Sequence, residues 1–329
     1  MYGYEIFHES IMNELIKTVH NNTAKQAYLF VGPVGVGKKI SAKLFAQSLV
    51  CTNSASSPCG ACAACVGTKS DTNPDVVYIR PTENKTVSVK QIREVIADVY
   101  VKPFHSAKKV YIIESAKDLL EPAQNSLLKV MEEPPEYAVF IIISESESFL
   151  LQTILSRCTV IRFPLVDDEA IYQFIKNNYP EEENRKEILA KLSNGSPKAV
   201  DDIINNPDFN NLRETSLKML LALVSKHLVS AYQICEFLEN NKENTELIFD
   251  FWDSFFRDIM CIKNGCEHLI TNSDLQEQLK NLSFRMDDNF PIIALEQLIL
   301  ARRMSARDVN LHFLALNLSF SIKNRLYGK

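Results

Sequence analysis

The chain has 329 residues, of which 46% are hydrophobic and 23% are charged, and its formal net charge is -5. This length predicts two or three domains. The acidic balance disfavours a protein whose main task is gripping DNA, because phosphate contacts depend on clustered lysine and arginine. No stretch approaches the roughly 20 apolar residues of a membrane span, and the acidic start is unlike a signal peptide. A cytoplasmic location is therefore expected, where the eight cysteines need an explanation other than disulfides.

Apolar strands alternate with helical patterns over residues 1–165. Strands are predicted at 27–32, 75–80, 108–114, 138–144 and 158–163. Helices are predicted at 38–50, 90–101 and 121–135. Runs rich in Val and Ile that alternate with helices are typical of a parallel sheet covered by helices on both faces. This region is therefore expected to be an α/β domain.

After Pro164 the strand pattern ends and the spacing of apolar residues becomes helical. Helices are predicted at 167–178, 185–204, 212–228, 230–240, 244–264, 273–282, 291–304 and 307–326. The expected architecture is an α/β domain at 1–165, a small helical domain at 166–207 and a larger all-helical domain at 208–329.

A candidate phosphate-binding loop, VGPVGVGKKIS, lies between the first strand and the helix that follows it, which is the context that the motif GxxxxGK[ST] requires. Its candidate nucleotide-binding residues are Gly32, Gly35, Val36, Gly37, Lys38 and Lys39. Glycines let backbone N–H groups turn toward a phosphate, the helix N-terminus adds partial positive charge, and Lys38 would reach the outer phosphates. The alternative is a glycine-rich turn with a surface lysine.

Two positions depart from an active ATPase. Lys39 replaces the Ser or Thr that holds magnesium, and a charged lysine has no lone pair to offer. An ammonium about 4 Å from Mg²⁺ would be repelled by about 8 kcal/mol at an effective dielectric near 20. The second catalytic element normally ends a buried strand as Asp-Glu, and here it ends as Glu114-Ser115. A serine is a poor general base without a neighbouring base, so lost hydrolysis is expected.

Four cysteines form a cluster with the spacing C-x7-C-x2-C-x2-C, at Cys51, Cys59, Cys62 and Cys65. Four thiolates close in sequence indicate a tetrahedral zinc site, and because protein fills all four positions the zinc would be structural. An iron–sulfur cluster, whose usual spacings differ, and unligated thiols are the alternatives. The remaining cysteines are scattered and are expected to be small buried residues.

Several motifs together resemble a known family. The helix NSLLKVMEEPP at 125–135 is similar to an NALLKxLEEPP helix of bacterial clamp-loader subunits, and TILSRC at 153–158 is similar to their SRC motif. The cysteine cluster after the phosphate-loop helix is typical of the same subunits. Further similar stretches are QIREV, PDVVYI, KVYIIE, KPFHSAKKV and NGSPKA. The chain thus resembles the AAA+ clamp-loader subunits of bacterial DNA polymerase III, strongly over 1–165 and more weakly beyond.

This resemblance implies a function that does not require the chain to hydrolyse ATP, which agrees with the altered positions Lys39 and Ser115. It implies an AAA+ phosphate-loop domain with a zinc module at 51–65, then a small helical lid and a helical collar that holds a ring-shaped pentamer together. Within the family, the departures are most similar to the delta-prime branch, which is often a rigid member without ATPase activity of its own. Such a subunit supplies the SRC arginine, here Arg157, as a finger to the ATP site of a neighbouring motor subunit. The alternative for Arg157 is a structural ion pair.

The resemblance also implies the partners and cofactors. Expected partners are the gamma/tau and delta subunits in a hetero-pentamer, with the sliding clamp and primer–template DNA reached through the complex. The expected cofactor is structural Zn²⁺. ATP or ADP is compatible with Lys38 and the loop amides, whereas Mg²⁺ is not expected. Of the residues that sense nucleotide in the family, the first position falls on Ser146 and the second on Lys198, where lysine lacks the planar fork of arginine.

Two other functions are left open by these residues. One is an ATP-hydrolysing motor subunit of the gamma/tau kind, which ATP turnover by the isolated chain would support. The other is a zinc-stabilised interaction module outside replication, which failure to associate with clamp-loader partners would support. The sequence has no credible pair of metal-binding carboxylates for nucleotidyl transfer, so the chain alone is not expected to be catalytic, and polymerase activity would belong to the holoenzyme.

Overall fold

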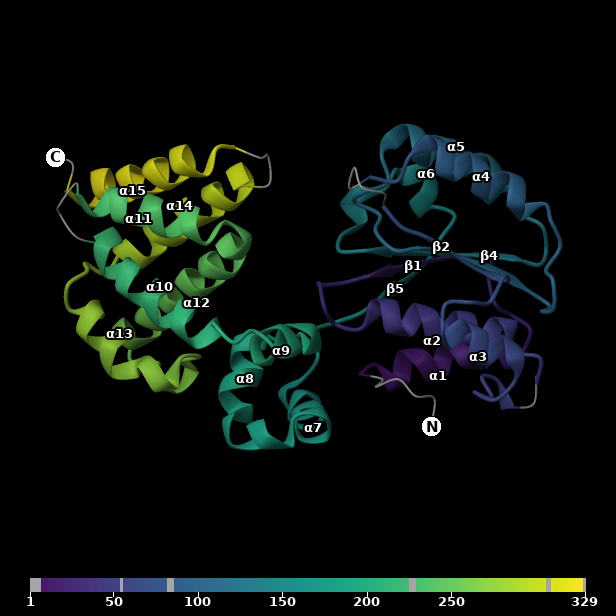
Figure 1. The fold of residues 1–329 in the computed structure, drawn as a ribbon, viewed down its shortest axis with the longest axis horizontal. Coiled ribbons are helices and arrows are strands. Elements are labelled where there is room, and N and C mark those ends of the chain that lie inside the picture. Colours follow the sequence, from purple (N-terminus) through teal and green to yellow (C-terminus); the bar gives the residue numbers. More distant parts are fainter. Residues whose placement is uncertain (1–6, 54–55, 82–85, 225–228, 306–308, 328–329) are drawn as a thin grey trace. The chain divides into compact units, whose positions relative to one another are not determined.

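The structure is a computed structural model that describes residues 7–53, 56–81, 86–224, 229–305 and 309–327 (Figure 1). The chain divides into two compact units, one made of residues 1–186 and 193–199 and the other of residues 187–192 and 200–329. The finer division of the chain into three domains stays a prediction. Among the described residues, no helix combines the length and the apolar character needed to cross a membrane.

The first unit is built around a five-stranded sheet with the strand order β2-β3-β4-β1-β5, in which all neighbouring strands are parallel. The strands are β1 (Ala27–Val31), β2 (Val76–Ile79), β3 (Lys109–Ile113), β4 (Ala138–Ser144) and β5 (Thr159–Arg162). Every residue of β1, β3 and β4 is buried, as expected for strands covered on both faces. The predicted α/β domain is confirmed.

Helices cover both faces of this sheet: α1, α2 and α3 lie on one side, and α4, α5 and α6 lie on the other (Figure 1). Their bounds are α1 (Glu9–His20), α2 (Lys38–Val50), α3 (Ala63–Lys69), α4 (Val89–Val99), α5 (Glu121–Glu132) and α6 (Gln152–Leu155). Short 3-10 turns are η2 (Glu147–Phe149) and η3 (Pro180–Arg185). The core on the α4–α5 side includes Tyr111 stacked on Phe140, with 5.2 Å between ring centroids. On the other side, Tyr28 meets Phe45 of α2 edge-on at 4.9 Å.

The helices after the sheet are α7 (Asp168–Asn178), α8 (Lys186–Ser193) and α9 (Pro197–Ile204). The single helix predicted over 185–204 is wrong, because the chain turns between α8 and α9. Asn194 and Gly195 have φ angles of 47° and 72°, which belong to the left-handed region and end a helix. Pro197 then begins α9, at a position where its missing N–H costs nothing.

The second unit is all helical in its described residues, as predicted. Its helices are α10 (Phe209–Val224), α11 (Val229–Asn240), α12 (Thr245–Lys263), α13 (Gln276–Ser283), α14 (Phe290–Ser305) and α15 (Leu311–Tyr327), with 3-10 turns η4 (Lys242–Asn244), η5 (Glu267–Leu269) and η6 (Ser273–Leu275). Residues 225–228 and 307–308, at ends of predicted helices, lie outside the described residues. At the centre, the fully buried Trp252 donates its indole N–H to the carbonyl of Ser216 at 2.9 Å.

Candidate functional site

The phosphate loop connects β1 to α2, as the motif predicts. Gly35 and Gly37 have φ angles of 80° and 97°, which side chains rarely adopt, so both positions need glycine. The amide of Gly32 donates to the carbonyl of Ser144 at 3.2 Å, which fixes the loop to the end of β4. No side chain caps the N-terminus of α2. Its first N–H groups therefore have no intrahelical acceptor and are available to an anion.

Two segments outside the phosphate loop contact it, one before β1 and one at the start of α9, and the sequence did not indicate either contact. The ring of the buried His8 lies 2.9 Å from the carbonyl of Val36, and burial lowers the pKa of His8 more than this hydrogen bond raises it. On the other side, a Cβ atom at Gly35 would lie 2.1 Å from Oγ of Ser196 and 3.0 Å from Cβ of Lys198. The start of α9, including the predicted sensing position Lys198, thus packs directly against the phosphate loop.

Lys38 lies inside the loop. It is only 6% exposed, and its Nζ donates to the carbonyls of Gly32 at 2.6 Å and Pro33 at 2.5 Å. An ammonium has three donors, so two are used and one remains. Burial lowers the pKa of Lys38, and the nearby Glu145 opposes this shift. Glu145, which sequence reasoning overlooked, follows β4 and accepts a hydrogen bond from Lys117 at 3.0 Å.

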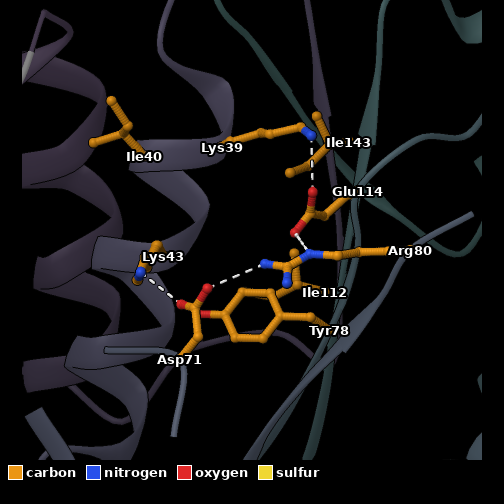
Figure 2. Close-up of a pocket in the computed structure, with 9 residues that line it drawn as sticks. All are labelled: Lys39, Ile40, Lys43, Asp71, Tyr78, Arg80, Ile112, Glu114 and Ile143. Atoms are coloured by element: carbon orange, nitrogen blue, oxygen red, sulfur yellow. Dashed lines mark hydrogen bonds and ion pairs between the residues drawn. The ribbon is translucent and has the colours of Figure 1, made fainter. Parts of the chain in front are cut away.

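Lys39 and Glu114, the two altered positions, are in direct contact (Figure 2). Nζ of Lys39 donates to Oε2 of Glu114 at 2.8 Å, and Nε of Arg80 donates to Oε1 at 2.5 Å. Burial favours the neutral form of Glu114, but its two bases outweigh burial and lower the pKa of this carboxyl. Mg²⁺ requires oxygen ligands, and both carboxylate oxygens here are occupied by cationic donors. The residues present therefore do not fit Mg²⁺.

These contacts belong to a longer chain of charges. Arg80 also pairs with Asp71 at 3.1 Å, and Asp71 pairs with Lys43 of α2 at 2.5 Å. The guanidinium of Arg80 lies over the ring of Tyr78, 4.8 Å from its centroid. Together these side chains surround a cavity of about 270 Å³, which is lined by Lys39, Ile40, Lys43, Asp71, Tyr78, Arg80, Ile112, Glu114 and Ile143 (Figure 2). Arg80 was not predicted, because nothing in its local sequence marks it.

Two further predicted positions, Ser115 and Ser146, lie just beyond the ends of β3 and β4. Ser115 follows Glu114 at the end of β3, and its neighbour Ala116 donates its amide to the carbonyl of Ile143. Ser146 caps η2 through the amide of Ser148, and the hydroxyl groups of these two serines lie 2.8 Å apart. Neither of these contacts gives Ser115 or Ser146 a base that could activate water.

The four predicted metal ligands come together. Cys51 ends α2, Cys62 is the N-cap of α3 and Cys65 lies within α3. All four Sγ atoms, including that of Cys59, lie within 4.8 Å of one another. The Sγ atoms of Cys51 and Cys62 are 4.0 Å apart, and those of Cys59 and Cys65 are 3.9 Å apart. A tetrahedral zinc with Zn–S bonds of about 2.3 Å would need about 3.8 Å, so the site fits this ion.

Backbone amides donate to three of the four sulfur atoms, whereas burial raises the pKa values of the Cys51 and Cys65 thiols. The amides of Cys59, Cys62 and Cys65 each donate to the sulfur of the preceding cysteine in the cluster, at 3.3–3.5 Å. Burial disfavours ionisation of Cys62, but hydrogen bonds from Thr52 and Cys65 outweigh it and lower the pKa of this thiol to about 6. Thiolates are the form that binds a metal. The four predicted ligands are thus brought together. Of the scattered cysteines only Cys235 is buried, so the prediction of burial was wrong for Cys158, Cys261 and Cys266, which are partly exposed.

Arg157 lies away from the cavity, between α6 and β5. Its Nη2 atom pairs with Glu132 of α5 at 2.7 Å, and its Nη1 atom donates to the carbonyl of Thr153 at 2.7 Å. The Arg157 side chain is 32% exposed and that of Glu132 is 54% exposed. Within the described chain the arginine thus makes the ion pair that was the alternative to a finger, although it stays accessible from solvent.

Comparison with known proteins places these features in context. Residues 7–167 match the family described as DNA polymerase III, delta subunit. The DNA polymerase III subunit delta' of Bacillus subtilis (strain 168) is 29% identical over 274 residues, which cover 82% of this chain and 82% of that protein. The subunit delta' of Pseudomonas aeruginosa is 37% identical over 175 residues, covering 52% of this chain and 53% of that protein. The subunit tau of Bacillus subtilis is 28% identical over 322 residues, covering 90% of this chain and 55% of that protein.

Proposed function

We propose that the chain, which is similar to the delta' subunits of bacterial DNA polymerase III, acts in DNA replication as a non-hydrolysing clamp-loader subunit. It assembles with gamma/tau and delta subunits in a hetero-pentamer, and through this complex it meets the sliding clamp and primer–template DNA. It helps to load the clamp onto primed DNA. Its Arg157 reaches the ATP site of a neighbouring motor subunit and acts there as an arginine finger.

The contact between Lys39 and Glu114 carries this proposal. Hydrolysis of a nucleoside triphosphate needs a metal that bridges the phosphates and a residue that positions the attacking water. Here the carboxylate in the metal position is held by Lys39 at 2.8 Å and by Arg80 at 2.5 Å. The next residue, Ser115, is a poor base. The loop retains the glycines and lysine of a phosphate site without the groups that would carry out the reaction.

The surroundings of Arg157 support its role in a neighbour's site. An exposed ion pair contributes only about 0.2–1 kcal/mol, so the pair with Glu132 is released at little cost when a better anion is presented. A guanidinium placed against the transferring phosphoryl group stabilises the charge that develops there. The subunit therefore acts on ATP that is bound by its partner.

Zinc has a structural role in this proposal. Cys51, Cys59, Cys62 and Cys65 would hold one Zn²⁺, and with all four ligand positions filled by protein the ion has no open position for a substrate. It would join the C-terminus of α2 to the N-terminus of α3. Because α2 begins at the phosphate loop, the ion fixes the far end of the helix that forms this loop.

The test is the DNA- and clamp-stimulated ATPase activity of the reconstituted loader, compared between the wild type and Arg157→Ala. We expect the variant to assemble normally and the turnover of the neighbouring site to fall by about tenfold or more, a smaller effect than the roughly 10³–10⁵ of arginine fingers in GTPases. The matched control is Arg162→Ala, which removes another exposed arginine whose ion pair, to Glu147, is also 2.7 Å long. Normal assembly with unchanged ATPase activity in Arg157→Ala would contradict the assignment of Arg157 as an arginine finger.

A second candidate function is the ATP-hydrolysing motor subunit, which the similarity to the tau subunit over 90% of this chain favours. The isolated chain separates the two functions. No ATP turnover is expected from it with Mg²⁺ present, whereas turnover that is lost in Lys38→Ala would establish the motor function and contradict our proposal.

A further inference from the structure

The cavity beside the phosphate loop contains an ammonium group where a phosphate-loop ATPase has a metal ion. Lys39 comes from the first turn of α2, and its Nζ reaches Oε2 of Glu114 at the end of β3 (Figure 2). These are the two positions that hold magnesium in such enzymes. A cationic side chain thus lies between the same two elements that a divalent cation would connect.

The charges of the site balance without a divalent ion. In the usual arrangement, a neutral Ser or Thr, two carboxylates and Mg²⁺ sum to zero. Here Lys39, Glu114 and Ser115 also sum to zero, and no metal is included. The gain of one positive charge and the loss of one carboxylate together replace the two charges of Mg²⁺. Addition of a divalent cation would leave an uncompensated excess of positive charge beside Arg80, at a carboxylate whose oxygens are already bonded.

The phosphate loop itself remains ready for an anion. Lys38 is 6% exposed and uses two of its three N–H donors on the carbonyls of Gly32 and Pro33. In the described part of the chain, no third acceptor contacts this ammonium. The N-terminus of α2 has no side-chain cap. A buried ammonium with one donor left and an uncapped helix N-terminus together point to a phosphate group as ligand.

We infer that this loop binds a nucleoside tri- or diphosphate without a divalent cation, with the ammonium of Lys39 taking the place of the metal. The inference deepens the proposed function and rests on its non-hydrolysing part. A polyphosphate bound in this way stays intact, because no metal bridges its phosphates and no base activates water. The bound nucleotide thus stabilises the subunit without being consumed.

The experiment measures equilibrium binding of ATP and ADP to the isolated full-length chain by calorimetry, once in EDTA and once in excess MgCl₂. We expect the wild type to bind in EDTA at least as tightly as in MgCl₂, because Mg²⁺ in solution competes for the phosphates. Lys38→Met should weaken binding by about tenfold or more, which locates the nucleotide in the loop. Lys39→Met should weaken binding in EDTA by a similar factor. The matched control is Lys90→Met, an exposed lysine in the first turn of α4 and outside the cavity, which should change neither value.

A double substitution tests the inference in the opposite direction. Lys39→Thr with Glu114→Asp restores the usual metal ligands, so ATP binding should become about tenfold tighter in MgCl₂ than in EDTA. Tighter binding of ATP to the wild type in MgCl₂, equal binding by wild type and Lys39→Met in EDTA, or no binding of either nucleotide would each overturn the inference. None of these results involves Arg157, so the proposed function could still be supported by the ATPase activity of the loader.

Discussion

Nζ of Lys39 lies 2.8 Å from Oε2 of Glu114, although the two residues are 75 positions apart in the chain. The side chain of Lys39 is 65% exposed, whereas that of Glu114 is only 13% exposed and also holds Arg80. The carboxylate is therefore the centre of the contact, and the two bases are its partners. Loss of the acid leaves two cations facing each other, while loss of Lys39 leaves one intact pair.

The free energy of unfolding should reflect this asymmetry. Glu114→Gln is expected to lower it by about 1–3 kcal/mol, because the largely buried side chain at this position loses the charge that accepts from both bases. Lys39→Met is expected to lower it by less than about 1 kcal/mol, as for an exposed ion pair. Urea-induced unfolding of both variants at pH 7 measures the two values. Equal losses would mean that the contact with Arg80 contributes little.

Removal of the zinc ion should destabilise the protein at the C-terminal end of α2. The purified chain is expected to contain one zinc ion, and Cys62→Ser should lose it and lower the melting temperature by about 5 °C or more, which corresponds to about 2 kcal/mol. Zinc analysis and thermal unfolding check this. Cys266→Ser, outside the cluster, should retain both zinc and stability. An iron–sulfur cluster would instead appear as iron and a visible absorption band.

Gly35 should be one of the least tolerant positions of the loop. Gly35→Ala places a Cβ atom 2.1 Å from Oγ of Ser196 and adds the strain of a φ angle of 80°. The strain alone costs about 1–2 kcal/mol, and the clash adds to it. Gly60→Ala, at a φ angle of 70° with nothing within 4 Å, isolates the strain. Thermal unfolding should show a clearly larger loss for Gly35→Ala, and equal losses would contradict the packing of α9 on the loop.

Because of Asp75, the free energy of unfolding should depend on pH in the acid range. Its carboxylate, which is 1% exposed, accepts the amides of Phe104, His105 and Ser106 at 2.5, 2.9 and 2.9 Å. Burial favours the neutral acid, but the amides of Phe104 and His105 outweigh it and lower the pKa of Asp75 below its ordinary value of 3.8. A lowered pKa in the folded state stabilises the fold above that ordinary value, and the stabilisation is lost as the pH falls through the lowered pKa.

Comparison of the wild type with Asp75→Asn reveals this contribution. The variant is expected to lose about 1–3 kcal/mol of unfolding free energy at pH 7. The difference between the two proteins should stay constant down to about pH 5 and shrink below pH 3.8, the ordinary value. Urea titrations at a series of pH values measure it. A difference that grows on acidification would mean that the aspartate is neutral in the fold.

The parallel sheet and most helices could be predicted from the sequence because their signals are local. Buried Val and Ile runs such as β4, and the glycines before Lys38, carry their own pattern. The helix α1 was not predicted, although Met12, Leu15 and Ile16 form its buried face, because it stands alone before the first strand, outside the alternation of strands and helices. The turn between α8 and α9 was missed because helical periodicity on both sides concealed Gly195.

The candidate site was predicted only where spacing determines it. The four cysteines lie within 15 positions of sequence, so their proximity follows from the chain itself. The contact of Arg80 with Glu114 and the support of Val36 by His8 join residues 34 and 28 positions apart. Such contacts depend on which strands are neighbours and on how helices are placed over the sheet, and a single sequence contains no direct signal for either.

The charges around the cavity alternate in sign from Lys43 through Asp71, Arg80 and Glu114 to Lys39, so each acid holds two bases. The hydration of charged groups becomes less favourable as temperature rises, so the cost of keeping such groups partly out of water falls on heating. This edge of the sheet should therefore weaken less on warming than a purely apolar contact of similar size. The same ion pairs that exclude a metal from the loop should therefore keep α2 attached to the ends of β2 and β3 as the temperature rises.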